Sequence, residues 1–287
     1  DKINMHILMI LLVLTLACGI RLLYPFTLMG MSRWQISLIT FIVPPLLLIV
    51  TTISIVSMGY DGKMLGLPSS RFSYSTSIIF LGIALVKFIK TTLQGCDSVK
   101  VIKNYPKQVI NNYLVRIVEI DLPYSAQIGF WNPELIISSG LLKSLDLNHL
   151  KAVIAHEEAH KNYHDTFYFF WLGWLKTISS WLPNTNMIWE ELLLLREIRA
   201  DKEAIKNIDP LVLAESLIIV ARKMNLVAKN NSTGFVEVCF HDMNTNSRLE
   251  KRIKALFEMS EDLENDNSHI NYLLLVLLPL LSIPFHN

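Results

Sequence analysis

The stretch AHEEAHKNYHD, residues 155–165, places two histidines four positions apart and a glutamate directly after the first. In a helix, His156 and His160 lie on one face, one turn apart. This spacing lets two imidazoles bind one Zn²⁺, at Zn–N distances of about 2.0–2.1 Å. Glu157 lies about 100° round the helix. It is therefore badly placed as a ligand but well placed as general base for a water at the metal. The pattern predicts a zinc-dependent hydrolytic site on a helix.

The residues just before the motif favour burial of this helix. Leu150, Val153 and Ile154 are apolar and form a turn ahead of the histidines. The alternative is a chance H-E-x-x-H on a solvated helix. Unpaired histidine and glutamate are costly to bury, so an apolar setting favours the zinc interpretation.

Upstream of the motif, the sequence is typical of short strands. Residues 114–120 and 126–130 are expected as strands, and residues 132–138 as a turn and a strand, because an Asn-Pro step marks a turn. The resulting hairpin, residues 126–138, has an edge that can pair an extended peptide substrate by strand addition. Two helices are expected next, residues 141–145 and residues 148–165, the second capped by Asp146 or Asn148.

A third metal ligand is expected from outside this helix. His164 lies one turn beyond His160, but a third histidine on the same straight helix cannot converge on the same metal. We expect His164 and Asp165 at the helix end, with Asp165 as a group that supports a ligand from behind.

The stretch WEELLLLREIRADKEAI, residues 189–205, is the better source of that ligand. It is typical of a helix and carries Glu197 and Asp201 at i and i+4. One carboxylate can bind zinc, and the other can accept the N–H of a ligating histidine and set its tautomer. Glu190 and Glu191 are rivals, but neither has a carboxylate at i+4. The alternative is a solvated charged face, which suits Arg196, Arg199 and Lys202.

The composition is more apolar than that of a soluble domain. Hydrophobic residues make up 52% of the 287 residues and charged residues 18%, with a mean hydropathy of +0.38. Such values are atypical of soluble proteins. A membrane span needs about 20 mostly apolar residues. Four segments approach that length: residues 5–23, 34–60, 72–89 and 270–285. The first lacks a small-x-small cleavage site, which favours a retained anchor over a signal peptide.

Residues 166–182, TFYFFWLGWLKTISSWL, form an aromatic and apolar run with a single charge, Lys176. We expect a re-entrant or interfacial segment, because Trp and Tyr prefer the headgroup level. Core packing is the first alternative. A further span is the second, but it would put His160 and Glu197 on opposite sides of the bilayer.

The distribution of charge predicts the orientation. From Lys87, near the end of the third apolar segment, to Lys107, five lysines stand against one acid, Asp97. Cytoplasmic flanks carry such an excess, so we expect residues from about 90 to 268 in the cytoplasm and the N-terminus outside. The net charge of +1 gives no footprint of nucleic-acid binding. The three cysteines form no C-x-x-C pair and indicate neither a disulfide framework nor a thiolate zinc site.

The combination of H-E-x-x-H with a later helix carrying E-x-x-x-D resembles the gluzincin membrane peptidases. Within that class the chain is most similar to the BlaR/MecR-type antirepressor peptidases. Three stretches carry the resemblance, which covers roughly residues 100–260: AQIGFWNPELIISSGLL (126–142), LKAVIAHEEAHKNYHDTF (150–167) and LLLLREIRADKEA (192–204). Antibiotic-sensing relatives have an extracellular sensor after the fourth span. The expectation here is a member without that C-terminal domain.

The resemblance implies a role for each residue of the site. His156, His160 and Glu197 would bind one Zn²⁺, Glu157 would be the base, and Asp201 would support a ligand from behind. Residues 240–258 are amphipathic and add basic groups that can stabilise an oxyanion, with surface or structural roles as the alternative. These groups are His241, Arg248 and Arg252.

The expected fold is mainly α. It is a multi-span membrane protein with about four transmembrane helices and a small α+β gluzincin-type zinc peptidase domain between the third and fourth. The expected domains are residues 1–93, 94–268 and 269–287.

The expected function is a zinc endopeptidase of a bacterial cytoplasmic-type membrane. Its substrate is a cytoplasmic regulator, such as a DNA-binding repressor, or the protease itself, and the chain does not bind nucleic acid directly. The alternatives are an HtpX-like quality-control protease and a zinc-stabilised signalling scaffold without activity.

Overall fold

The computed structural model describes residues 5–24, 31–61, 63–64, 67–68, 70–230, 245–258, 276–280 and 283. The contacts divide the chain into two units. The first unit contains Asp1–Thr92, Trp171–Leu192 and Asp262–Asn287. The second unit contains Leu93–Phe170 and Leu193–Glu261.

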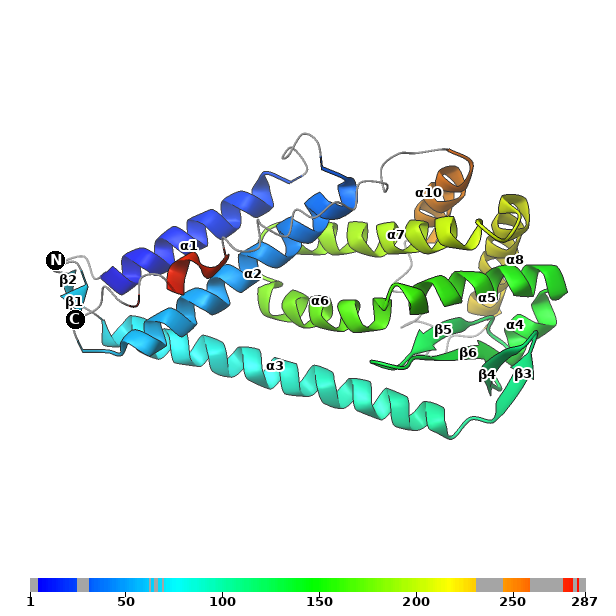
Figure 1. Ribbon diagram of the computed structural model, residues 1–287, viewed down its shortest axis with the longest axis horizontal. Coiled ribbons are helices and arrows are strands. Elements are labelled where there is room, and N and C mark those ends of the chain that lie inside the picture. The colour runs from blue at the N-terminus through cyan, green and yellow to red at the C-terminus, as the bar shows by residue number, and fades with distance from the viewer. Residues whose placement is uncertain are drawn as a thin grey trace. The chain divides into compact units, whose positions relative to one another are not determined.

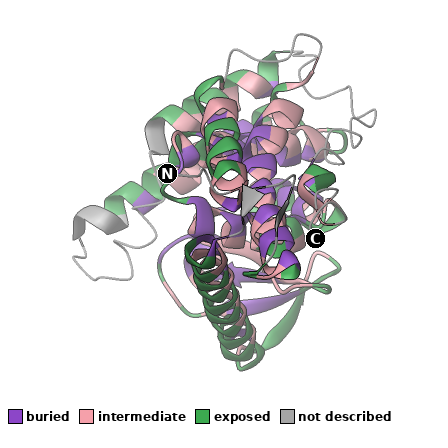
Figure 2. Ribbon diagram, turned by 90° about the vertical axis from the view of Figure 1, so that its left-hand side faces the viewer, coloured by how far each residue is buried: buried purple, intermediate pink, exposed green. Residues whose placement is uncertain are grey.

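Among the described residues, three helices have the length and hydropathy of a membrane span: α1 (Met5–Leu22), α2 (Arg33–Met58) and α3 (Arg71–Lys103). Of these, α1 and α2 lie side by side in the first unit (Figure 1). The expected third span was residues 72–89, but α3 continues to Lys103, because no proline interrupts it and Lys100 and Lys103 suit its C-terminal end. Most of α3 is exposed (Figure 2). The expected fourth span, residues 270–285, lies mostly outside the described residues.

A buried arginine supports the proline step of α2. The helix runs through Pro44 and Pro45. Proline has no N–H, so Pro45 leaves the carbonyl of Phe41 without its usual partner. The Nη2 of Arg21 on α1 donates to that carbonyl at 3.1 Å, and the guanidinium lies over the Phe41 ring. Arg21 is fully buried, and this contact gives a physical reason for an arginine in an otherwise apolar helix. A short strand pair, β1 (Lys63–Met64) and β2 (Leu67–Pro68), connects α2 to α3.

The second unit contains a four-stranded sheet. Its strands are β3 (Lys107–Ile110), β4 (Tyr113–Val118), β5 (Ser125–Ile128) and β6 (Glu134–Ser138), in the order β3-β4-β6-β5. β4 and β6 are parallel and the other two pairs are antiparallel. The expected hairpin of residues 126–138 is the β5–β6 pair, and β5 lies at the edge. β3 was not expected. Asn111 and Asn112 both have positive φ, as a two-residue hairpin turn requires.

Helices α4 (Ser139–Ser144) and α5 (Leu147–Asn162) cover one face of this sheet (Figure 1). The side chain of Asp146 caps α5 by accepting from the backbone of Asn148 and His149. Alternate residues of β4 and β6 form a core with the apolar turn of α5. Its buried members are Val115, Ile117, Leu135, Ile137, Leu141, Leu145, Leu150, Val153 and Ile154.

The helix that carries the histidines is shorter than expected. It ends at Asn162 rather than at Asp165, because His164 takes a left-handed conformation with φ of 53°. Asp165 then begins a new helix, α6 (Asp165–Ser179). This turn redirects the chain so that Asp165 faces His160 instead of continuing along α5.

Three further helices complete the described fold: α7 (Thr185–Ala204), α8 (Pro210–Asn230) and α10 (Thr245–Phe257). In the second unit, Ala152 of α5, Ala204 of α7, Leu213 of α8 and Leu256 of α10 share one buried cluster. Small residues at the contact let these helices approach closely. This packing brings α7 and α10 to the histidine face of α5.

Candidate metal site

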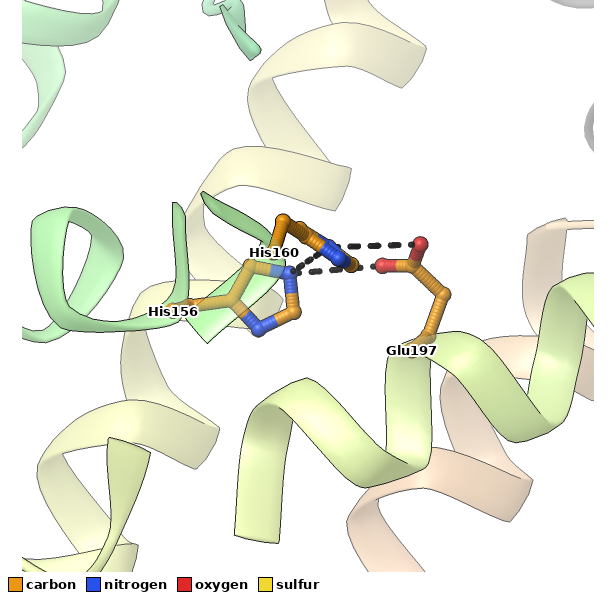
Figure 3. Close-up of side chains that lie close together, drawn as sticks. All are labelled: His156, His160 and Glu197. Atoms are coloured by element: carbon orange, nitrogen blue, oxygen red, sulfur yellow. Dashed lines mark hydrogen bonds and ion pairs between the residues drawn. The ribbon is translucent and has the colours of Figure 1, made fainter. Parts of the chain in front are cut away.

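Three side chains from two helices converge on one point (Figure 3). His156 and His160 project from α5, and Glu197 projects from α7. The two histidine Nε2 atoms are 3.1 Å apart. A Glu197 oxygen lies 3.3 Å from Nε2 of His156, and its other oxygen lies 3.6 Å from Nε2 of His160. The three groups form a set of potential metal ligands whose atoms all lie within 4.8 Å of one another.

These separations fit a tetrahedral zinc ion. With Zn–N and Zn–O distances near 2.0–2.1 Å, two ligand atoms of one Zn²⁺ stand about 3.3 Å apart. The observed distances between ligand atoms fall around that value. Two imidazoles and one carboxylate are also a donor set that catalytic zinc uses, with a fourth position left for water or substrate.

A carboxylate and an arginine stand behind His156. Its Nδ1 lies 2.8 Å from Oδ1 of Asp201, which is almost fully buried. Arg252 of α10 donates to both oxygens of Asp201 at 2.7 Å, from Nε and Nη2. Its Nη1 lies 3.2 Å from Glu197. Arg252 therefore links the carboxylate behind the histidine to the carboxylate in front of it.

An aspartate and an arginine also stand behind His160, but they come from α6 and α7. Its Nδ1 lies 2.7 Å from Oδ2 of Asp165, the first residue of α6. Arg199 of α7 donates to the other oxygen of Asp165, and its guanidinium lies 4.2 Å from the centre of the Tyr163 ring. Each histidine is thus backed by a buried aspartate, and each aspartate by an arginine. Such partners hold an imidazole in one tautomer and orientation.

The charges set the protonation state of the site. Burial lowers the pKa of His156, but Asp201 and Glu197 outweigh it and raise the pKa to about 9. Burial likewise lowers the pKa of His160, and Asp165 and Glu197 raise it above its ordinary value. Burial raises the pKa of Glu197, yet Arg196 and Arg252 hold it well below 4.5. Both shifts favour the protonated imidazoles, and a metal ion that binds there competes with those protons.

Glu157, the expected base, is buried beside the histidines. The hydroxyl of Ser125 donates to its Oε1 at 2.7 Å. Ser125 is the first residue of the edge strand β5, so the strand expected to pair a peptide also orients the glutamate. Sequence reasoning missed Ser125, because a single serine at a strand end carries no local signal.

The structure distinguishes among the carboxylates of α7. Glu191 pairs with Arg33, and Glu190 is exposed, so neither faces the histidines. The solvated-face alternative also fails for Arg199, which pairs with the buried Asp165.

The residues expected to stabilise an oxyanion are only partly described by the structure. The guanidinium of Arg252 is engaged by Asp201 and Glu197. His241 lies outside the described residues. The roles of ligand, base and oxyanion stabiliser remain predictions, and the geometry places the groups that would fill the first two.

Two histidines and one glutamate arranged in this way are a donor set that zinc metallopeptidases use. Residues 107–233, from β3 into α8, match the model of Peptidase family M48. The match supports an M48 zinc metallopeptidase domain in this chain, together with three helices apolar enough to span a membrane. No curated protein shows significant similarity to the chain. The match to the M48 model does not test the narrower resemblance to the BlaR/MecR-type peptidases.

Proposed function

We propose that this protein is a membrane-embedded, zinc-dependent endopeptidase. The observation that carries the proposal is the convergence of His156, His160 and Glu197 on one point, inside the segment that matches the M48 model. The three apolar helices support a membrane setting.

Each residue of the site then has a task. These three side chains would hold a zinc ion, which would supply a Lewis acid for the peptide carbonyl and would lower the pKa of a water to about 7. The Glu157 carboxylate accepts the proton of the attacking water and later gives it to the leaving amine. Ser125 holds Oε1 of Glu157, so its hydrogen bond favours one orientation of that carboxylate. Asp201 and Asp165 keep the two imidazoles facing inward.

The substrate class follows from the stretches that resemble the antirepressor peptidases. We propose a cytoplasmic regulator of the repressor type, or the chain itself, with the second unit on the cytoplasmic side. The edge strand β5 supports an extended peptide as the bound form, since its outer edge can accept one more strand.

Metal content and cleavage, measured on the purified full chain, test this proposal. One equivalent of zinc is expected, and chelation should stop cleavage of an unfolded probe protein such as casein. His156→Ala and His160→Ala should lose zinc and activity, whereas Glu157→Gln should keep zinc and lose activity. His164→Asn is the matched control, because His164 is exposed and asparagine tolerates its left-handed backbone. Zinc retained by the double histidine variant, or normal turnover by Glu157→Gln, would refute the proposal.

A further inference from the structure

Four aromatic side chains of the second unit, two exposed and two half-buried, form a cluster that the proposed chemistry does not use. Phe130 and Trp131 come from the turn between β5 and β6, and Phe167 and Tyr168 come from the first turn of α6. Phe167 is the centre, with ring centroids 4.9 Å from Phe130, 4.7 Å from Trp131 and 5.4 Å from Tyr168. Trp131 is 68% exposed and Tyr168 is 58% exposed. We call these four residues the aromatic patch.

The turn that carries Trp131 is tightly built. Gly129 has a φ of +142°, and a Cβ at this position would come within 2.9 Å of Cα of Pro133. Only glycine fits such a backbone without strain. Because the turn is closed in this way, Trp131 is held outward on a short, constrained loop. A large apolar side chain in that position is more than a scattered surface residue, since it stands beside a second exposed aromatic side chain.

Contacts between α6 and α3 within the first unit indicate the depth of α6 in the bilayer. There, Trp171 stacks on Phe88 at 5.5 Å, and the indole of Trp174 donates to the carbonyl of Ala84 at 3.0 Å. Lys87 donates to the carbonyl of Thr177. These α3 residues lie where its apolar run, residues 72–89, ends and its lysine-rich part begins. A run of that length spans about 27 Å, close to the thickness of the hydrocarbon core. The tryptophans of α6 therefore contact α3 at the end of its membrane-spanning part.

The aromatic patch begins less than one helical turn away along the same helix. Tyr168 precedes Trp171 by three residues, which is a rise of about 4.5 Å. Trp and Tyr are enriched where a protein crosses the headgroup layer, because an apolar ring and a polar N–H or O–H suit both sides of that boundary. The chemistry of Trp131 and Tyr168 matches this layer.

We propose that the aromatic patch rests in the headgroup layer of the bilayer. The second unit would then have a lipid contact of its own, besides the spans of the first unit. The contact does not depend on zinc or on peptidase activity. Its consequence is that the edge strand β5, directly before the patch, is held at the membrane surface, where membrane-proximal segments of a substrate are within reach.

Depth-dependent quenching tests the proposal. In the full chain, Cys18, Cys96 and Cys239 are replaced by alanine. A cysteine introduced by Trp131→Cys or, in a second variant, by Tyr168→Cys is then labelled with the fluorophore NBD. The protein is reconstituted into vesicles of phosphatidylcholine with a minor share of phosphatidylglycerol. Part of the phosphatidylcholine carries a doxyl quencher, placed either near the headgroup or near the chain end. Lys143→Cys is the control, because the Lys143 side chain is 70% exposed and on a different surface element, α4.

We expect a loss of NBD emission at positions 131 and 168 that is larger with the shallow quencher than with the deep one, and no loss at position 143. Quenching at 131 or 168 no stronger than at 143 would overturn the proposal. The proposal would also be overturned if NBD emission at position 131 responded only to added peptide substrate and not to the lipid quenchers. That result would make the patch a peptide-binding surface. Zinc content and cleavage are measured on the same samples, so a failed lipid contact is distinguishable from a failed peptidase.

Discussion

Among the individual residues, Arg252 connects two carboxylates of the candidate site. Its guanidinium is largely buried and contacts two carboxylates, Asp201 and Glu197. An arginine fork suits this task, since its donors meet one carboxylate in two parallel hydrogen bonds and leave another donor free. Without Arg252, the buried Asp201 would have only His156 beside it to offset its charge, and Glu197 would keep Arg196 and the histidines. We infer that Arg252 acts through the ligands, as a positioning residue, rather than directly on the reacting peptide.

The substitution Arg252→Met tests this role. It keeps most of the side-chain volume but removes the charge, so Glu197 and Asp201 should repel each other and turn. We expect zinc affinity to fall by about 10–100-fold, the usual effect of losing a group that orients a ligand. Competition with a chelator measures the affinity directly.

Lys251→Met is the matched control, because Lys251 is the exposed neighbour on the same helix. Unchanged zinc affinity in Arg252→Met, with cleavage alone lost, would mean that Arg252 acts on the oxyanion instead.

Between elements, two polar contacts tie neighbouring segments together. Arg116 of β4 is buried and donates to Glu134 at the start of β6 and to the carbonyls of Lys103 and Tyr105. It therefore joins the parallel strand pair to the segment that follows α3. Hydrogen bonds from Arg116 and Lys107 lower the pKa of Glu134 from 4.5 to about 2.

The contacts of Glu134 with Arg116 and Lys107 should make the stability of the protein depend measurably on pH. A carboxylate whose pKa is lowered by folding stabilises the fold fully above pH 4.5, and this contribution disappears as the pH falls towards 2. Glu134→Gln should lower the free energy of unfolding at neutral pH by on the order of 1 kcal/mol, since the carboxylate is partly exposed. The difference from the parent should vanish towards pH 2. Denaturant unfolding in detergent at several pH values measures it.

Asp121→Asn provides the control for that series. Asp121 pairs with Lys143, but both side chains are strongly exposed, so its removal should change stability little. A Glu134→Gln difference that stays constant from neutral pH to pH 2 would contradict the assignment.

The contact between Arg21 and α2 predicts an energetic coupling. Pro45→Ala restores an N–H for the Phe41 carbonyl, so the hydrogen bond from Arg21 should become less valuable. In a double-mutant cycle of Arg21→Met with Pro45→Ala, we expect a coupling energy of about 1 kcal/mol in the free energy of unfolding. Pro44→Ala in place of Pro45→Ala is the control, because it frees the carbonyl of Thr40 instead. Equal coupling for both prolines would contradict the proposed contact.

For the whole molecule, the main expectation concerns orientation. Three helices are suited to span a membrane, and the lysine excess follows the third. Three crossings by these helices would place the N-terminus and the second unit on opposite sides of the bilayer. From the lysine distribution, we expect the second unit in the cytoplasm.

Reporter fusions test that orientation. Alkaline phosphatase fused after Lys107 should stay inactive and a fluorescent protein at the same position should emit, because the fusion point would be cytoplasmic. Fusions after Tyr60, in the loop between α2 and α3, should show the reverse pattern. Active phosphatase after Lys107 would show that the second unit lies outside.

The sequence by itself determined what depends on neighbouring residues. A helix alone brings His156 and His160 to one face, because they are spaced i, i+4. The apolar runs of α1 and α2 predict the length of each helix and about where it ends. The cap of α5, for which the sequence offered Asp146 or Asn148, and the pair β5–β6 are local for the same reason. Each of these features follows from backbone geometry over a few residues, which periodicity and turn residues report.

Only the tertiary structure decided which distant groups meet. In the structure Glu197, rather than Glu190 or Glu191, lies beside the two histidines. Arg252 contacts Asp201, from which it is separated by 51 positions in the sequence. The tertiary structure also ended α5 early, so that Asp165 faces His160. The packing of separate helices and of a sheet against them sets these distances. Periodicity within one helix says which face is apolar, but it contains no information on the partner helix or on the register at which the two will pack.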